Sequence, residues 1–264
     1  MSNAASRVLV AAAGLPVVLG AVYLGGWWLF ALVLVAVVAG LHEFWLLARP
    51  FSPLSPAGYV GGILALIGAE LGGAQWMLGG VLAAFPLAFA LKGISASRQG
   101  PTASISTTIM GAVWVGCGLG FVLLIRDLHR GRLVTLAVLL AVWAGDTLAY
   151  VGGRLLGRHR MAPATSPGKT WEGFVFGTTA TVFVTFVTLY DDRHDYLSVG
   201  RALILGAVIA VAAPLGDLFE SMLKRDAGVK DSGRLMGAHG GLLDRVDAFL
   251  FAAPAAYFAL LALT

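Results

Sequence analysis

The chain has 264 residues, of which 58% are hydrophobic and only 12% charged, and its mean hydropathy is +0.85. Soluble domains carry about 25% charged residues, so this chain could not cover a globule of its own size with polar surface. The composition excludes a disordered protein and an ordinary cytosolic enzyme, and a single cysteine, Cys117, excludes a disulfide-stabilised secreted domain. The net charge of +4 fits membrane topology and attraction to anionic lipid, so no nucleic-acid partner is expected.

The apolar stretches are long and continuous, which predicts transmembrane helices rather than the strands of a barrel. The expected fold class is all-α, a polytopic transmembrane helical bundle of eight to nine helices. The third stretch falls short of the roughly 20 residues that a span needs, so it is expected to be tilted, re-entrant or joined to the fourth. The first is expected to be a retained helix rather than a cleaved signal peptide. The stretches cover residues 8–24, 27–48, 57–72, 74–91, 105–125, 133–153, 171–190, 201–221 and 246–263.

Basic residues give the orientation of these spans. With the N-terminus in the cytoplasm, thirteen of the eighteen Lys and Arg residues fall on the cytoplasmic side. The turn over residues 126–132, with three arginines, goes against this rule. The chain also divides by chemistry. Residues 1–145 contain three acidic residues and no polar cluster. Residues 1–130 are expected to form N-terminal transmembrane helices, and residues 131–264 a C-terminal catalytic half.

Carboxylates inside membrane spans are costly, so each is a functional candidate. Asp146 falls in the middle of the sixth span. Asp217 and Glu220 fall near the end of the eighth, on one helical face that Ser221 and Lys224 continue. Asp244 and Asp247 open the ninth, where a helix N-terminus favours negative charge. The alternative is simple pairing with neighbouring bases, such as Asp217 with Lys224 or Arg225 and Asp244 with Arg245. Carboxylates facing basic loops suit Mg²⁺, which combines one or two of them with substrate phosphates.

Two polar loops accompany these acids. In the first, Gly168-Lys169-Thr170 resembles part of a P-loop, but Pro163 stands where that motif needs glycine, so a P-loop is rejected. The remaining prediction is a cluster of Ser166, Lys169 and Thr170 at the start of a seventh helix, where backbone N–H groups and the helix dipole suit a phosphate. Glu172 is expected in the first turn of that helix. The alternative is a loop that binds lipid headgroups nonspecifically.

The second loop, residues 221–247, mixes bases, acids and glycines in a way that lipid anchoring does not require. Its composition predicts a site for a triphosphate, a metal and a second phosphate. The segments that matter are Lys224-Arg225, Lys230-Asp231-Ser232-Gly233, His239-Gly240-Gly241 and Asp244-Arg245-Val246-Asp247.

These segments closely resemble the signature of the phosphatidate cytidylyltransferases (CDP-diacylglycerol synthases). Residues 166–173, Gly216-Asp217 and the segment beginning at Asp146 are similar to that family as well. The resemblance covers about the C-terminal half. Met236 and Ala238 depart from the family's pattern without removing a charged group.

The resemblance implies an enzyme of phospholipid biosynthesis. It would convert CTP and phosphatidate into CDP-diacylglycerol and pyrophosphate, with Mg²⁺, at the cytoplasmic face of the cell membrane. It also suggests a second monovalent cation, such as K⁺, and a homodimer. His239 is expected either to donate to the leaving group or to fix the glycine turn. The implied catalytic residues are Lys224, Arg225, Lys230, Asp231, His239 and Arg245; the substrate-binding residues are Ser166, Lys169, Thr170, Glu172 and Ser221; and the metal ligands are Asp217 and Asp244, with Asp146 and Asp247 as weaker candidates.

Two other functions fit parts of the pattern. A secondary transporter also has intramembrane carboxylates, but it would place them in both halves of the chain. A CTP-dependent polyprenol kinase would move the γ-phosphate of CTP to an alcohol. The fate of labelled CTP distinguishes the kinase from the cytidylyltransferase.

Overall fold

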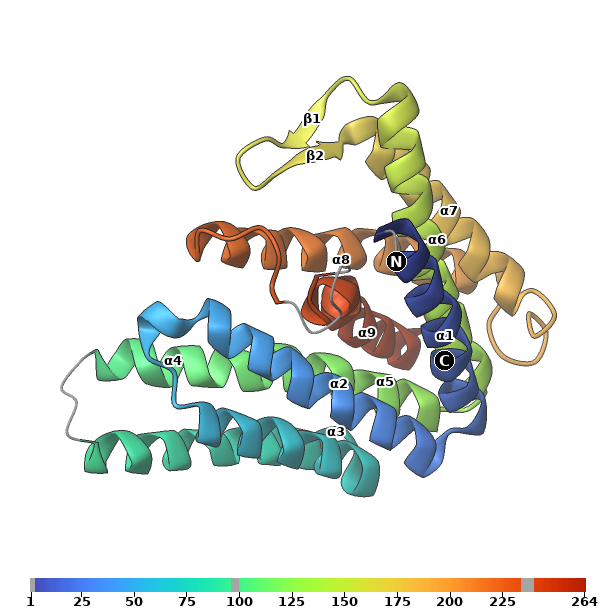
Figure 1. Ribbon diagram of the computed structural model, residues 1–264. Coiled ribbons are helices and arrows are strands. Elements are labelled where there is room, and N and C mark those ends of the chain that lie inside the picture. Colours follow the sequence, from blue (N-terminus) through green and yellow to red (C-terminus); the bar gives the residue numbers. More distant parts are fainter. Residues whose placement is uncertain (1–2, 96–99, 234–239) are drawn as a thin grey trace. The chain divides into compact units, whose positions relative to one another are not determined.

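A computed structural model describes residues 3–95, 100–233 and 240–264, with side chains described from residue 14 onward within these ranges. The described chain is almost entirely helical (Figure 1). It divides into two compact units, residues 1–124 with 226–246 and residues 125–225 with 247–264. The helices are α1 (Asn3–Leu24), α2 (Gly26–Leu47), α3 (Ser55–Ile94), α4 (Pro101–Gly111), α5 (Gly118–Asp127), α6 (Gly131–Leu156), α7 (Trp171–Leu189), α8 (Val199–Asp226) and α9 (Leu243–Leu263).

Seven of the described helical segments are long and apolar enough to cross a membrane, and Gly14–Leu24 forms a shorter apolar helix. The segment Pro101–Asp127 combines α4, a π-helical turn over Ala112–Cys117 and α5. These segments coincide with the predicted apolar stretches, because in each one a run of apolar side chains is long enough to span the hydrocarbon layer. The predicted fold class, a polytopic helical membrane protein, is therefore confirmed.

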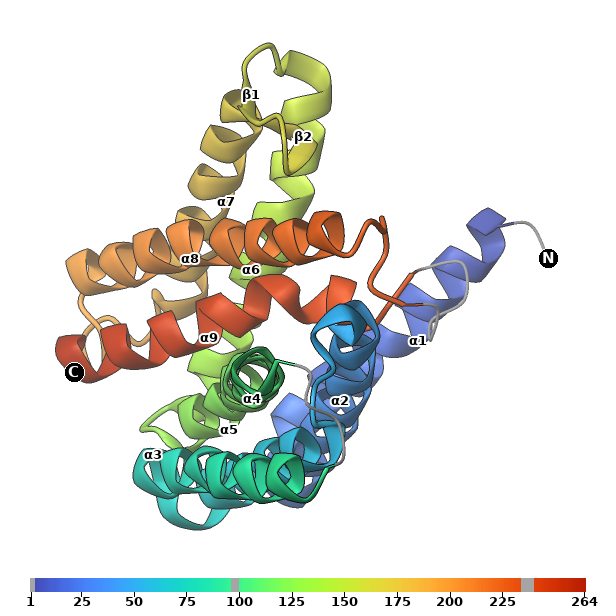
Figure 2. The ribbon, with the colours of Figure 1, turned by 90° about the vertical axis from the view of Figure 1, so that its left-hand side faces the viewer.

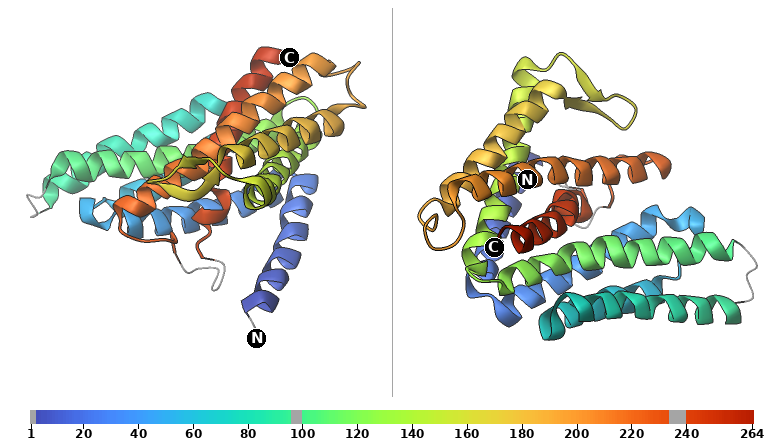
Figure 3. Two further views of the ribbon diagram at one scale, coloured as in Figure 1. Left: turned by 90° about the horizontal axis from the view of Figure 1, so that it is seen from above. Right: turned by 180° about the vertical axis from the view of Figure 1, so that it is seen from behind.

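The third and fourth predicted spans form the single element α3, which reverses direction at Gly73. The backbone of Gly73 has φ +71° and ψ −160°, a conformation that residues with a side chain rarely adopt. On either side of this break the two segments pack closely, since a Cβ on Gly68 would strike the Trp76 backbone and one on Gly80 the Leu64 backbone. Small residues of this kind let helices approach in a membrane. Figure 3 shows the resulting helical hairpin beside α4 and α5.

The first unit packs α2, α3 and the π-helical turn around small residues. The Trp45 ring of α2 lies against Gly58 of α3 and Gly111 of α4, and Gly116 packs against Gly62. Leu243, at the start of α9, contacts α2 near Gly40 and is fully buried. The segment 226–246 thus belongs with the N-terminal helices.

The second unit is built on the pair α6 and α7, which pack through small residues. A Cβ on Gly177 would approach the Gly145 carbonyl at 2.8 Å, and Thr181 Oγ1 donates to the Ala141 carbonyl at 3.2 Å. A short antiparallel hairpin, β1 (Arg160–Ala162) and β2 (Ser166–Thr170), lies at the end of this pair (Figure 2). The sequence did not indicate these strands, because Pro163, Pro167 and Gly168 interrupt any alternation.

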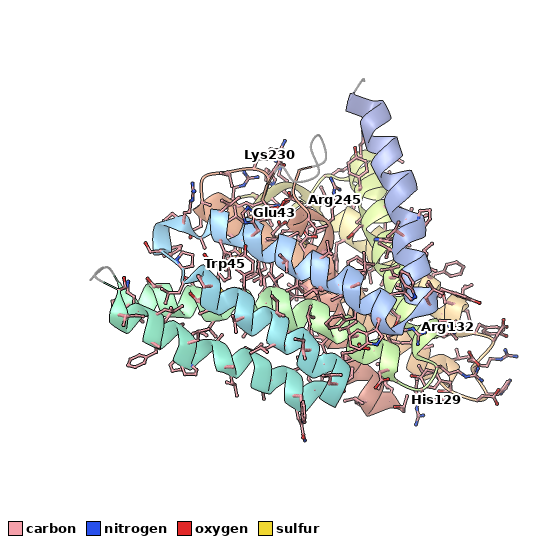
Figure 4. The ribbon with its side chains drawn as sticks, turned by 60° about the horizontal axis from the view of Figure 1, so that its bottom comes forward. Glu43, Trp45, His129, Arg132, Lys230 and Arg245 are labelled. Atoms are coloured by element: carbon pink, nitrogen blue, oxygen red, sulfur yellow. The ribbon has the colours of Figure 1, made fainter. Side chains whose placement is uncertain are left out.

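The basic turn over residues 126–132 contacts the loop after α7. Arg130 Nη2 lies 3.2 Å from Asp192 Oδ1 in the loop after α7, and the rings of His129 and Tyr196 are 5.7 Å apart. Figure 4 labels His129 and Arg132 in this turn. The turn that was expected to go against the orientation rule thus has an acidic partner in the loop after α7.

Candidate active site

The centre of the candidate site in the second unit is an ion pair between Lys169 and Asp217. Lys169 Nζ lies 2.8 Å from Asp217 Oδ2, and the two side chains are 20% and 36% exposed. The lysine comes from β2, and it also donates to the backbone carbonyl of Pro214 in α8, at 3.4 Å. The two polar segments expected to share one side of the membrane therefore meet. The predicted alternative paired Asp217 with Lys224 or Arg225, whereas its ion pair in the structure is with Lys169.

Two further side chains surround Asp217. Ser221, one turn later in α8, is buried and donates from Oγ to Asp217 Oδ1 at 3.3 Å. Asp146 lies in α6 with its side chain exposed, within electrostatic reach of both Asp217 and Lys169. A lysine near two carboxylates reduces the repulsion between them. Asp146 therefore belongs to the same polar cluster as Asp217.

Deeper in the second unit, α8 and α9 bring two more carboxyl groups together. Glu220 is fully buried, and Lys224 Nζ lies 2.7 Å from its Oε2 atom. Asp247 is 9% exposed, and its carboxyl group lies close to that of Glu220. The contacts of Ser221 with Asp217 and of Lys224 with Glu220 confirm that these residues share one helical face.

The loop that carries Lys169 is held by its own hydrogen bonds. Thr170 is the N-cap of α7 and accepts from the Gly173 N–H at 3.1 Å, which confirms its predicted place at the start of the seventh helix. Glu172, in the first turn, accepts from the backbone N–H groups of Arg158 and His159 and pairs with His159 Nδ1 at 2.6 Å. Because Glu172 holds the chain before β1, its contacts give it a role in shaping the loop.

The loop is also tied to α8. Arg225 Nε donates to the Thr165 carbonyl at 3.2 Å, and Ser166, half-buried, begins β2 next to it. Arg160 Nη1 donates across the hairpin to the Pro167 carbonyl at 3.0 Å. Ser166, Lys169 and Thr170 thus lie on one short, braced segment beside Asp217.

In the first unit, Asp244 organises the loop before α9. Its Oδ2 atom accepts from the Ser232 N–H at 3.1 Å, the Ser232 hydroxyl at 2.9 Å and the Gly241 N–H at 2.9 Å. A carboxylate held by three donors has a fixed position, which a metal ligand needs. Lys230, Asp231 and Arg245 are exposed around it, whereas His239 lies outside the described residues.

One carboxylate beside the loop that holds Asp244 was not predicted from the sequence. Glu43, in α2, is fully buried; its Oε2 atom accepts from the Leu243 N–H at 2.8 Å and lies 3.2 Å from the Ser232 hydroxyl. Residues 1–145 show no polar cluster in sequence, and Glu43 joins one only through Ser232 and Leu243 of the C-terminal half. The sequence could have indicated Glu43, because it is a single glutamate inside an apolar span. An ionisable side chain in a membrane span is costly and is therefore a functional candidate.

The donor chemistry of both units suits a hard divalent cation. Among the described residues, no three His, Cys, Asp or Glu side chains form a group that could hold a metal by themselves. Mg²⁺ usually takes one or two protein carboxylates and completes its shell with waters and substrate phosphates. Asp217 with nearby Asp146, and the tightly held Asp244, provide carboxylates of this kind.

The fold and the site define a class: a multi-pass helical membrane protein with carboxylates and lysines clustered at helix ends. The model of the cytidylyltransferase family matches residues 5–263, nearly the whole chain. A phosphatidate cytidylyltransferase of Synechocystis sp. is 32% identical over 285 aligned positions, which cover 96% of this chain and 94% of the relative. The chain belongs to the cytidylyltransferase family.

Other relatives align over about half of the chain. A phosphatidate cytidylyltransferase of Staphylococcus haemolyticus is 41% identical over 137 positions, 52% of each chain. One of Haemophilus influenzae is 39% identical over 132 positions, 49% of this chain and 46% of the relative. Both similarities are consistent with the resemblance found in the signature segments.

Proposed function

We propose that this protein transfers the cytidylyl group of CTP to phosphatidate in a membrane, giving CDP-diacylglycerol and pyrophosphate. The observation that carries the proposal is the Lys169–Asp217 pair, which places a cation and a carboxylate together in a member of the cytidylyltransferase family. A phosphate oxygen of phosphatidate forms a bond to the α-phosphorus of CTP. The bond from that phosphorus to the α,β-bridging oxygen breaks, and pyrophosphate leaves with the bonding electron pair.

The main barrier to this reaction is the approach of two polyanions, so charge neutralisation and positioning supply most of the rate. Phosphatidate is already a nucleophile near neutral pH, and no strong general base is required. Lys169 is proposed to share the hydrogen bonds of its ammonium group between Asp217 and a phosphate oxygen. Ser166 and Thr170 would donate further hydrogen bonds to the phosphate. The remaining negative charge of the two substrates is proposed to be neutralised by four bases, Lys224, Arg225, Lys230 and Arg245.

Mg²⁺ is proposed as the cofactor, with Asp217 and Asp244 as ligands and Asp146 and Asp247 as weaker candidates. When bound, it would supply positive charge to the phosphate oxygens. Ser221 keeps the Asp217 carboxylate oriented, and Ser232 and Gly241 keep Asp244 oriented. A monovalent cation such as K⁺ is a further proposal that rests on the family resemblance alone.

The location of the enzyme is also part of the proposal. The distribution of basic residues supports a plasma-membrane protein whose active site faces the cytoplasm, where CTP is available. A homodimer is proposed from the resemblance. Light scattering of the detergent-solubilised protein measures its mass, and a monomer mass would contradict the homodimer.

Labelled CTP tests the function. Purified protein is incubated with phosphatidate, Mg²⁺ and CTP labelled either in cytidine or in the γ-phosphate. Cytidine label in the lipid with γ-label in pyrophosphate supports cytidylyl transfer, whereas γ-label in the lipid would identify a kinase. Chelation of divalent ions by EDTA should stop the reaction, and Mg²⁺ should restore it; activity that persists in EDTA contradicts the metal assignment.

A further inference from the structure

Glu43 lies where a membrane helix would ordinarily carry an apolar residue. It is in α2, in a segment long and apolar enough to span a membrane, and its side chain is 0% exposed. Figure 4 shows it near the segment that carries Lys230 and Arg245, while Trp45 lies toward α3. Burying a carboxylate is costly unless it is hydrogen-bonded, so its contacts indicate what it does.

Those contacts are with the groups that hold Asp244. Glu43 Oε2 accepts from the Leu243 N–H at 2.8 Å. Leu243 is the first residue of α9 and the neighbour of Asp244 in the sequence. The same oxygen lies 3.2 Å from the Ser232 hydroxyl, which in turn lies 2.9 Å from Asp244 Oδ2. Glu43 and Asp244 therefore share Ser232, and both fix the start of α9.

Two glycines leave room for this carboxylate. A Cβ on Gly233 would clash with Glu43 Oε1, and a Cβ on Gly241 would clash with Glu43 Oε2 and with Ser232 Oγ. Glu43 Oε1 is buried, and no described residue hydrogen-bonds to it. The loop thus closes tightly around the glutamate, and only one of its two oxygens makes the contacts with Ser232 and Leu243.

An apolar contact also joins the start of α9 to the face of α2 that carries Glu43. Gly40 lies one turn before Glu43, and a Cβ at that position would meet a Leu243 side-chain carbon at 3.7 Å. Leu243 is fully buried there. The start of α9 is thus held to α2 by an apolar contact and by a hydrogen bond one turn apart.

We propose that Glu43 is a positioning residue for cytidylyl transfer, because it holds Ser232 and the first turn of α9 and thereby sets the orientation of the Asp244 carboxylate. This inference rests on the proposed function, in which Asp244 contributes to binding the metal–nucleotide complex. It assigns a functional role to a residue in the N-terminal half, which the signature segments do not include.

The test compares three variants of the full-length protein: Glu43→Leu, Glu43→Gln and the control Trp45→Leu. Trp45 lies in the same helix and is buried, but its contacts are with Gly58, Gly111 and neighbouring rings. Two quantities are measured at saturating Mg²⁺. The first is the CTP concentration for half-maximal CDP-diacylglycerol formation, and the second is the CTP concentration for half-maximal increase of the thermal unfolding midpoint.

Glu43→Leu is expected to raise both CTP concentrations by about tenfold or more, since hydrogen bonds to a charged group are lost. The KM for phosphatidate should stay nearly constant. Glu43→Gln keeps an acceptor oxygen for Leu243 and Ser232, so its CTP dependence should remain within about threefold of the unmodified protein. Trp45→Leu should lower the unfolding midpoint and leave the CTP dependence unchanged.

The proposal is overturned if Glu43→Leu lowers only the unfolding midpoint, as Trp45→Leu does, or if Glu43→Gln is impaired as strongly as Glu43→Leu. If Glu43→Leu does not fold, Ser232→Ala decides, because it removes the shared hydroxyl; an unchanged CTP dependence then contradicts the proposal. If the unmodified protein forms no CDP-diacylglycerol, the proposed function fails separately, and the thermal measurement with Mg²⁺ and CTP still decides the role of Glu43.

Discussion

Lys169 and Asp217 are 48 residues apart in the sequence, and their side chains form an ion pair with an N–O distance of 2.8 Å. The pair joins the end of a short hairpin to the C-terminal part of α8, within electrostatic reach of Asp146. A cation that a carboxylate holds in this position is pre-organised to meet a phosphate, because it is already oriented and partly desolvated.

Lys169→Ala should lower the rate at subsaturating CTP and phosphatidate by about tenfold or more, the effect of losing a charge-assisted bond. Because the partners act together, the loss of CTP binding in the double variant Lys169→Ala/Asp217→Asn should be smaller than the product of the two single losses. Since Asp217→Asn is expected to form no measurable product, a double-mutant cycle on the CTP concentration for half-maximal increase of the thermal unfolding midpoint measures this coupling. Strictly multiplicative losses would mean that the two residues act independently.

Gly241→Ala should impair activity strongly, since its Cβ would strike both Ser232 Oγ and Glu43 Oε2. The loop would have to shift, and the Asp244 carboxylate with it. Gly79→Ala is the matched control, because a Cβ at Gly79 meets no atom within 4 Å. The initial rate and the unfolding midpoint of both variants are compared. Equal activities would show that the tight closure of the loop is not needed.

Thr170→Ala should reduce stability, because the N-cap hydrogen bond to the Gly173 N–H is lost. Removal of such a cap costs about 1 kcal/mol. Thr170→Ser retains the hydroxyl and should restore the thermal unfolding midpoint. A midpoint for Thr170→Ala equal to that of the unmodified protein would indicate that α7 begins without this cap.

Arg130→Ala removes an ion pair at the other end of the second unit, where the arginine is 46% and Asp192 19% exposed. Partly exposed pairs contribute about 0–1 kcal/mol, so stability should change little. Cytidylyl transfer should keep its normal rate. A large loss of activity would imply that the turn over residues 126–132 takes part in the reaction.

Much of the fold is predictable because the apolar runs are long. The spans ending near residues 47, 156, 189 and 263 follow from hydropathy alone, since a membrane helix needs little more than length and apolar side chains. The β1–β2 hairpin was not predicted, because two prolines and a glycine fall within nine residues and no alternation marks the strands. The sharp reversal at Gly73 is also a backbone property that a glycine-rich helix does not reveal by its composition.

The candidate site was predicted in its residue types but not in its contacts. The resemblance identified Asp217 and Lys169 separately, and only the structure shows that they pair. Glu43 was not predicted, because its partners Ser232 and Leu243 lie about two hundred residues away along the chain. Contacts this distant in sequence depend on the tertiary fold, which the order of residue types along the chain does not reveal.

The most direct test of the proposed chemistry is the transfer of cytidine-labelled CTP to phosphatidate by the unmodified protein and by Asp217→Asn and Asp244→Asn, at equal expression and similar unfolding midpoints. We expect labelled CDP-diacylglycerol and an equal amount of pyrophosphate from the unmodified protein, and neither product above background from either variant. Full product formation by both variants would contradict the assignment of these aspartates to the reaction.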